Sequence, residues 1–186
     1  MSSDLQSLVD TISEQEESLR FPYFSADVAW EIGSAVREQF MNARSQGRFQ
    51  KQGCVIQIST FTGQTLFAAA VGEESAIGPI NWKYVEGKKD VARNWNHSSF
   101  YVGQHALLKG WPREEYAFGG GFPIWIKGCP SAPLAIIVVS GLAEEDDHQL
   151  IVDTLSDYIP RMKPVAWRMG RLPPIPSKPA GHTMAR

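Results

Sequence analysis

Residues 118–159 read FGGGFPIWIKGCPSAPLAIIVVSGLAEEDDHQLIVDTLSDYI, and this stretch decides the fold. Within it, Leu134–Ser140 is a continuous apolar run rich in β-branched residues, which predicts a central buried strand. Acidic residues at 144–147 follow at once and predict the start of a helix over 143–159, because negative charge complements the positive end of the helix dipole. The stretch therefore predicts a strand–turn–helix corner at residues 140–142.

The rest of the chain adds helices and strands around this corner. Apolar residues at helical spacing predict further helices over 4–20, 25–45, 81–95 and 98–110. Short apolar runs predict further strands over 54–60, 64–71 and 122–126. The first two of these strands flank a turn at Gly63 and predict a β-hairpin. This order of elements indicates an α+β fold, in which helices pack on a mostly antiparallel sheet.

Composition indicates a soluble globular protein, with 43% hydrophobic and 20% charged residues among 186. No apolar run approaches the ~20 residues of a membrane helix, and the N-terminus lacks the features of a secretory signal. We therefore expect a cytosolic (cytoplasmic) protein with no membrane span. Cys54 and Cys129 are expected to be free and mostly buried, since a disulfide would require Cα atoms within about 7 Å.

The composition changes at Pro160, which predicts a single domain over 1–159 and a C-terminal arm over 160–186. The arm holds six of the 12 prolines and six basic residues with no acid. The body before it then carries the other 12 basic residues against all 20 acidic ones. A basic tail can bind nucleic acid, but its basic residues are sparse and interleaved with apolar ones. We favour an arm that packs on the acidic surface of its own body or of a neighbouring subunit, and expect no nucleic acid.

The glycine run at 119–121 is the first candidate for a binding site. Glycine allows a close approach of the backbone or a positive φ. A phosphate-binding loop would need a helix directly after the glycines, whereas Phe122–Ile126 reads as a strand. The run is then either a bulge where the strand begins or a strand edge that lines a ligand.

A cationic segment with a histidine is the second candidate. If the helix over 81–95 continues, Arg93 and His97 are i,i+4 neighbours, with Lys88 upstream on the same helix. Such a face suits a carboxylate, a phosphate, or haem propionates with an axial imidazole. The alternative is a helix-capping corner with solvated lysines.

The acidic segment Asp146-Asp147-His148 is the third candidate. Consecutive helical residues point about 100° apart and cannot converge on one metal ion, so we expect capping roles and no metal site. No HExxH, CxxC pair or GxSxG motif is present, and no catalytic set or reaction can be named from the residues.

Two motifs carry a family resemblance. One is W-x5-K-x2-V-x-R-x3-H-S-S over 82–99; the other is G-G-x-F-P-I over 119–124, followed by V-S-G-L at 139–142 and D-H at 147–148. Together they resemble the UPF0303 family of the haem-degrading-domain group, which includes GlcG-like and HbpS-like proteins. The resemblance covers about residues 5–160 and leaves out the arm.

The resemblance implies a profilin-like α/β sandwich, with an antiparallel sheet of about five strands flanked by helices. It also implies a homo-oligomer and a shared pocket for haem or another small anionic ligand. The polar and glycine positions that match the motifs are Lys88, Arg93, His97, Ser98, Ser99, Gly120, Gly121, Asp147 and His148. The alternative function is a non-catalytic oligomeric scaffold or adaptor that acts on a protein partner through the arm and the acidic faces.

Overall fold

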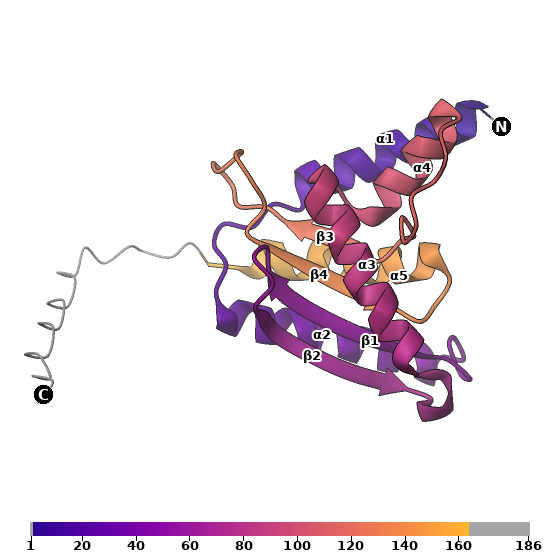
Figure 1. Ribbon diagram of the computed structural model, residues 1–186. Coiled ribbons are helices and arrows are strands. Elements are labelled where there is room, and N and C mark those ends of the chain that lie inside the picture. The colour runs from indigo at the N-terminus through magenta and orange to yellow at the C-terminus, as the bar shows by residue number, and fades with distance from the viewer. Residues whose placement is uncertain (1, 164–186) are drawn as a thin grey trace, which may run out of the picture.

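The computed structural model describes residues 2–163 (Figure 1). Most of the predicted arm lies outside the described residues. The helices are α1 (Ser2–Ser18), α2 (Ala26–Ser45), α3 (Pro79–Trp95), α4 (Ser99–Lys109) and α5 (Glu144–Tyr158), with short 3-10 helices η1 (Glu74–Ala76) and η2 (Ile159–Arg161). The strands are β1 (Gly53–Thr60), β2 (Thr65–Gly72), β3 (Gly121–Ile124) and β4 (Ala135–Ser140). These bounds confirm the predicted α+β order of elements.

The sheet is antiparallel throughout, with the order β2-β1-β4-β3. All residues of β4 are buried, as the apolar run predicts, and β4 lies between β1 and β3. The described residues form four strands rather than about five. At the outer side of β3, a single parallel bridge joins Phe21 to Ile126. The Phe21 amide donates to the Trp125 carbonyl, and the Phe21 carbonyl accepts from the Lys127 amide, both at 2.8 Å.

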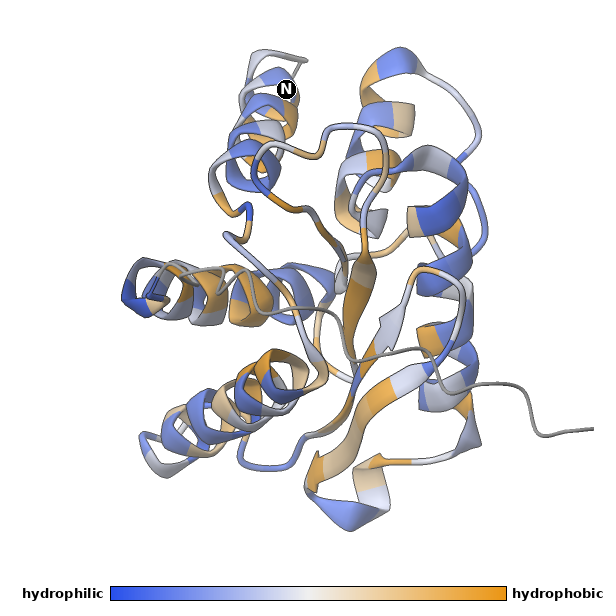
Figure 2. Cartoon of the chain, turned by 90° about the vertical axis from the view of Figure 1, so that its left-hand side faces the viewer, coloured by the Kyte–Doolittle hydropathy of each residue, from blue (hydrophilic) through white to orange (hydrophobic). Residues whose placement is uncertain are grey.

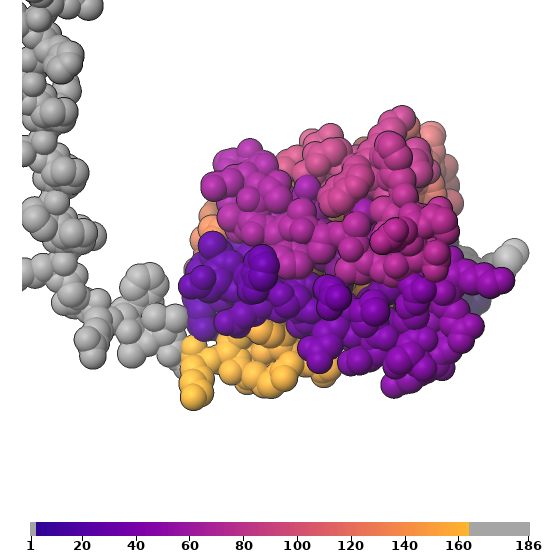
Figure 3. All heavy atoms as spheres, turned by 90° about the horizontal axis from the view of Figure 1, so that it is seen from below, coloured from indigo at the N-terminus to yellow at the C-terminus, as the bar shows by residue number. Residues whose placement is uncertain are grey.

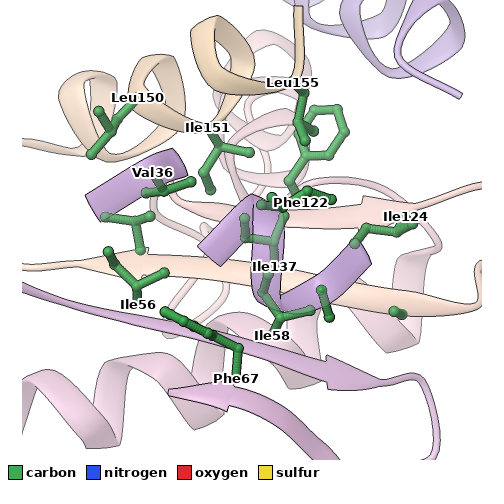
Figure 4. Packing of buried hydrophobic residues seen from close by; sticks show 14 of the residues in the cluster. Val36, Ile56, Ile58, Phe67, Phe122, Ile124, Ile137, Leu150, Ile151 and Leu155 are labelled. Atoms are coloured by element: carbon green, nitrogen blue, oxygen red, sulfur yellow. The ribbon is translucent and has the colours of Figure 1, made fainter. Parts of the chain in front are cut away.

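Helices cover both faces of the sheet (Figure 2). Alternate residues of β4 point to opposite sides, so Ile137 and Val139 pack toward α2 and α5 while Ile136 and Val138 pack toward α3. The larger core, between the sheet and the α2–α5 layer, includes Val36, Ile56 and Ile151 (Figure 4). Helix α1 lies against α4 beside β3 rather than over the middle of the sheet.

The end of α5 lies beside α2 in the view from below (Figure 3). There the Tyr158 hydroxyl donates a hydrogen bond to the Glu31 carboxylate. The chain continues through η2 to Lys163, the last described residue. The arm therefore starts at the edge of the α2–α5 layer.

The two cysteines differ in their surroundings. Both are free, but only Cys54 is buried, so the expectation that both thiols are buried is wrong for Cys129. Burial raises the pKa of the Cys54 thiol to about 12. None of the helices within residues 2–163 is long and apolar enough to cross a membrane.

Glycine at position 120 is needed where the chain enters β3. Gly120 has φ +110, and its carbonyl accepts a hydrogen bond of 2.8 Å from the Val139 amide. A Cβ added there would overlap the Val139 carbonyl oxygen and lie 2.9 Å from Lys88 Nζ. The close approach of Lys88 to β4 therefore depends on a missing side chain.

We predict that Gly120→Ala destabilises the fold far more than Gly128→Ala. Both glycines have positive φ, which costs an alanine about 1–3 kcal/mol. Only at Gly120 does the new methyl group also displace buried neighbours, since nothing lies within 4 Å of the corresponding position at Gly128. Urea unfolding of both variants measures the difference, and equal losses of stability would contradict this account of Gly120.

Candidate functional site

The centre of the site is a buried ion pair between the two helical layers. Lys88 on α3 lies 2.9 Å, Nζ to Oδ2, from Asp147 on α5, and Nζ also donates to the Val139 carbonyl at 3.0 Å. The Lys88 and Asp147 side chains are 2% and 3% exposed. Breaking such a pair by removing one partner costs about 3–5 kcal/mol, because a buried charge is left without compensation.

The Asp147 carboxylate also holds the predicted corner. It accepts hydrogen bonds from the amides of Gly141 at 3.4 Å and Leu142 at 3.1 Å. The start of α5 is therefore organised by an acid within its first turn, while the N-cap residue Ala143 supplies no side-chain cap. Burial raises the pKa of Asp147 to about 6, and Lys88 and the two amides oppose this shift.

The two glycines and the serine beside this pair shape the backbone. The Ser99 hydroxyl donates to the Phe118 carbonyl at 2.5 Å and accepts from the Gly121 amide at 2.9 Å. A Cβ on Gly121 would lie 2.9 Å from that hydroxyl. Ser99, Gly120 and Gly121 therefore form the support directly behind Lys88.

A cavity of about 310 Å³ opens beside the ion pair, and we call it the Lys88 cavity. Its lining residues are Ile80, Asn81, Tyr84, Lys88, Phe118, Ser140, Gly141, Leu142, Glu144 and Asp147. Within residues 2–163, the hydroxyls of Tyr84 and Ser140 have no hydrogen-bond partner. The Asn81 side-chain oxygen accepts from the Gly78 amide at 2.8 Å, and no described residue accepts from the Asn81 side-chain nitrogen, Nδ2.

The loop between α4 and β3 forms one wall of the cavity. Arg113 pairs with Glu144, donates to the Ala117 carbonyl at 2.7 Å, and stacks over Phe118 with 4.2 Å between guanidinium carbon and ring centroid. The carboxylate of Glu144 at the wall is thus neutralised by Arg113, as that of Asp147 is by Lys88. The cavity is lined by balanced charges and by apolar surface.

His148 points away from the Lys88 cavity. Its Nε2 lies 3.0 Å from the Gln15 side-chain oxygen on α1, and its ring packs against Phe100 and Phe122. Burial lowers the pKa of His148 to about 4, so the ring is neutral at pH 7. It joins α5 to α1 and does not line the cavity.

The expected cationic face with histidine does not form. Helix α3 ends at Trp95, and Asn96 takes a left-handed conformation with φ 55, so His97 is turned away from Arg93. Arg93 instead donates to the Phe61 carbonyl at 2.9 Å and pairs with Asp90. Lys88 reaches Asp147 and meets neither of them.

His97 lies in a second cleft of about 370 Å³, which we call the His97 cleft. It is lined by Ser13, Glu16, Glu17, Arg20, Asn96, His97 and Trp125. Glu16 Oε2 lies 2.6 Å from His97 Nδ1, and its other oxygen accepts from the Ser98 amide at 2.7 Å. Ser98 caps α4 by accepting from the Tyr101 amide. The Nε atom of Arg20 is buried and has no partner within the described residues.

The nine predicted positions therefore divide between places. Lys88 and Asp147 line the Lys88 cavity, and three others support it from behind. His97 lines the His97 cleft and the buried Ser98 bonds Glu16 beside it, while Arg93 and His148 make separate structural contacts. No group of three or more His, Cys, Asp or Glu side chains within residues 2–163 is arranged to hold a metal ion.

Five residues that complete the site were not predicted from the sequence. Asn81, Tyr84, Ser140 and Glu144 line the cavity, and Arg113 pairs with Glu144. Tyr84 precedes Lys88 by one helical turn, and this i,i+4 spacing was a usable signal. Ser140 closes the predicted strand at the corner, where ligand-facing residues are often found. Nothing in the local pattern indicates that Arg113 meets Glu144, since 31 positions separate them.

Comparison with known proteins places the chain in a family. A family model described as haem degrading protein HbpS-like matches residues 24–156. The chain belongs to this HbpS-like family. A UPF0303 protein of Rhizobium meliloti is 32% identical over 157 residues, which cover 80% of this chain and 88% of that protein. A UPF0303 protein of Burkholderia mallei is 36% identical over 161 residues, which cover 82% of this chain and 87% of that protein. The predicted resemblance to UPF0303 is confirmed.

Solved structures related to this HbpS-like chain confirm its fold class. The Ybr137w protein superposes with a TM-score of 0.69 at 23% identity, covering 82% of this chain and 87% of that one. HbpS superposes with a TM-score of 0.53 at 23% identity, covering 73% and 90%. At these identities the likeness concerns the fold alone.

We predict that Lys88→Met lowers the free energy of unfolding by about 3–5 kcal/mol at pH 7. The fold raises the pKa of Asp147 from 3.8 to about 6, so the folded state favours the protonated carboxyl group. The stability that this protonated group contributes is fully present below pH 3.8 and is lost as the pH rises through 6. A protonated Asp147 needs no cation, so the deficit of Lys88→Met should shrink as pH falls from 7 to 4. Urea unfolding across this range measures it.

The control is the double variant Lys88→Met/Asp147→Asn, in which the amide oxygen can still accept from Leu142. It should recover most of the lost stability at pH 7, because no buried charge remains. A deficit that does not change with pH, and is not relieved in the double variant, would contradict the role given to the ion pair.

Proposed function

We propose that the protein binds a small carboxylate- or carbonyl-bearing molecule in the Lys88 cavity. The observation that carries this proposal is the position of a buried lysine beside hydroxyls with no protein partner, those of Tyr84 and Ser140. Neither hydroxyl is fully buried, so both are open to the cavity, and polar groups that face a cavity without a protein partner are available to orient a ligand.

The Lys88 ammonium has a hydrogen-bond donor to spare. An ammonium group carries three N–H donors, and the protein uses two, toward Val139 and Asp147. The third is available to a ligand oxygen. With the Tyr84 and Ser140 hydroxyls and the Asn81 amide, the cavity offers donors of the kind that bind carboxylate and carbonyl oxygens.

The N-terminal end of α5 forms part of the cavity wall. Leu142 and Glu144 at the start of α5 line the cavity, and Ala143 gives the helix no side-chain cap. The Asp147 carboxylate already accepts from the Gly141 and Leu142 amides there, so a ligand meets directed side-chain donors rather than an open helix terminus. A volume of about 310 Å³ lies at the lower end of the range for ligand pockets, which favours a compact molecule.

We predict saturable binding of pyruvate and of propanoate, measured by isothermal titration calorimetry on the full chain. Tyr84→Phe and Ser140→Ala should each weaken binding several-fold, because each removes a hydrogen bond of about 1 kcal/mol. Tyr101→Phe is the matched control, since Tyr101 lies on α4 outside the Lys88 cavity. Binding that is the same in all three variants would place the ligand elsewhere.

Haem is the second candidate ligand, and family membership together with the His97 cleft favours it. A histidine that ligates a metal commonly bonds a carboxylate through its other ring nitrogen, and Glu16 stands in that position toward His97. Arg20 lines the same cleft, where its guanidinium pairs with Glu17 at 2.5 Å and could be shared with a propionate. The residues present therefore fit haem at this cleft, where the iron would supply redox chemistry when bound. The expected contributions of Lys88 and Arg93 to the same haem have no support in the structure.

We predict a Soret shift that saturates at one haemin per chain when the full chain is titrated. His97→Ala should abolish the shift, whereas His105→Ala, which changes a histidine outside the cleft, should retain it. Lys88→Arg should also retain it. A shift that persists in His97→Ala would exclude the His97 cleft as the haem site.

A further inference from the structure

The Lys88 cavity holds an amine and an acid in contact, a combination that reacts with carbonyl compounds. We propose that Lys88 forms an imine with a small aldehyde or ketone that enters the cavity, with Asp147 moving the proton. This inference rests on the proposed binding of a small ligand there and adds a covalent step to it.

Lys88 differs from the two lysines nearest to it in sequence. Lys83 is exposed to solvent, as lysine side chains usually are. Lys89 is buried, but its ammonium is held by Gln57 at 2.7 Å and by Glu86 at 2.6 Å, and it does not line the cavity. Lys88 alone of the three combines burial, an acidic partner and a cavity wall. Lysines removed from water are those that serve as amine nucleophiles.

The proton balance closes within the pair. The Lys88 ammonium first gives a proton to the Asp147 carboxylate, 2.9 Å away. The free amine then adds to the carbonyl carbon, the C–N bond forms, and a proton passes from nitrogen to the former carbonyl oxygen. Asp147 donates its proton to the resulting hydroxyl, which leaves as water as the C=N bond forms. The net change is ammonium plus carbonyl to iminium plus water, with no oxidant or reductant consumed.

The residues around Lys88 suit both the first and the last step of this reaction. The hydroxyls of Tyr84 and Ser140 can donate to the carbonyl oxygen while the amine attacks. Burial favours the protonated form of Asp147, so the proton acceptor is poised near neutral pH. The product iminium keeps its positive charge opposite the Asp147 carboxylate, so the buried charges remain paired throughout.

The test is reductive trapping of the full chain with pyruvate and sodium cyanoborohydride, read by intact mass and by peptide mapping. We expect one adduct, on Lys88, formed before any on exposed Lys83. Lys88→Arg should lose this adduct, and Lys83→Arg should retain it. Asp147→Asn should slow labelling about 100-fold, the usual range for a lost general acid. Excess propanoate should protect Lys88 by occupying the cavity.

The outcomes separate the two proposals. If Lys88 stays unmodified while calorimetry still shows pyruvate and propanoate in the cavity, the imine is overturned and the binding proposal stands. If neither binding nor labelling occurs, both are overturned. Labelling that is equal at Lys83 and Lys88, and insensitive to propanoate, reflects general lysine reactivity and also overturns the imine. Because Asp147→Asn affects a buried pair, its fold is checked by circular dichroism, and Tyr84→Phe gives a second, milder reduction in rate.

Discussion

The fold depends on one interaction that passes from one helical layer to the other. Lys88 comes from the helix on one face of the sheet and Asp147 from the helix on the opposite face, and they meet at the end of β4. The same carboxylate holds the turn between β4 and α5. The residue before β3 must then be glycine, because a Cβ at Gly120 would overlap the Val139 carbonyl oxygen and lie 2.9 Å from Lys88 Nζ. A single ion pair thus sets the sheet edge, the corner and the cavity wall.

Such an arrangement gives the cavity a fixed lining. Charged groups that are buried and fully paired have few alternative positions, so the ligand-facing atoms are held before a ligand arrives. The balance of Lys88 with Asp147 and of Arg113 with Glu144 leaves no strong excess of either charge. Recognition in this cavity must come from directed hydrogen bonds and shape rather than from net attraction. The His97 cleft differs in its charges, because it is lined by two carboxylates, those of Glu16 and Glu17, and by one guanidinium, that of Arg20.

Much of the fold could be predicted from local patterns, and the site only in part. The buried run of β4, the corner after it and the serine cap of α2 follow from residue chemistry within a few positions. The separation of Arg93 from His97 did not follow, because it depends on Asn96 leaving the helix in a left-handed conformation. The pairing of Lys88 with Asp147 joins residues 59 apart, and no periodicity encodes such a contact. The motifs shared with the UPF0303 family pointed to Lys88 and Asp147 as site residues but not to the ion pair between them. The profilin-like architecture, the homo-oligomer, the cytoplasmic location and the role of the arm stay predictions.

The contacts that hold α1 have a consequence for the order in which the chain folds. Its Glu16 side chain bonds residues at the start of α4, and its Gln15 side chain meets His148 on α5, 133 positions later. The segment that follows, at Phe21, pairs with Ile126. During synthesis on the ribosome, α1 must therefore wait for the start of α4, 82 positions after Glu16, before its main partner exists, and longer still for His148. Contacts so distant in sequence slow folding, and α1 is expected to dock only after α4 has formed.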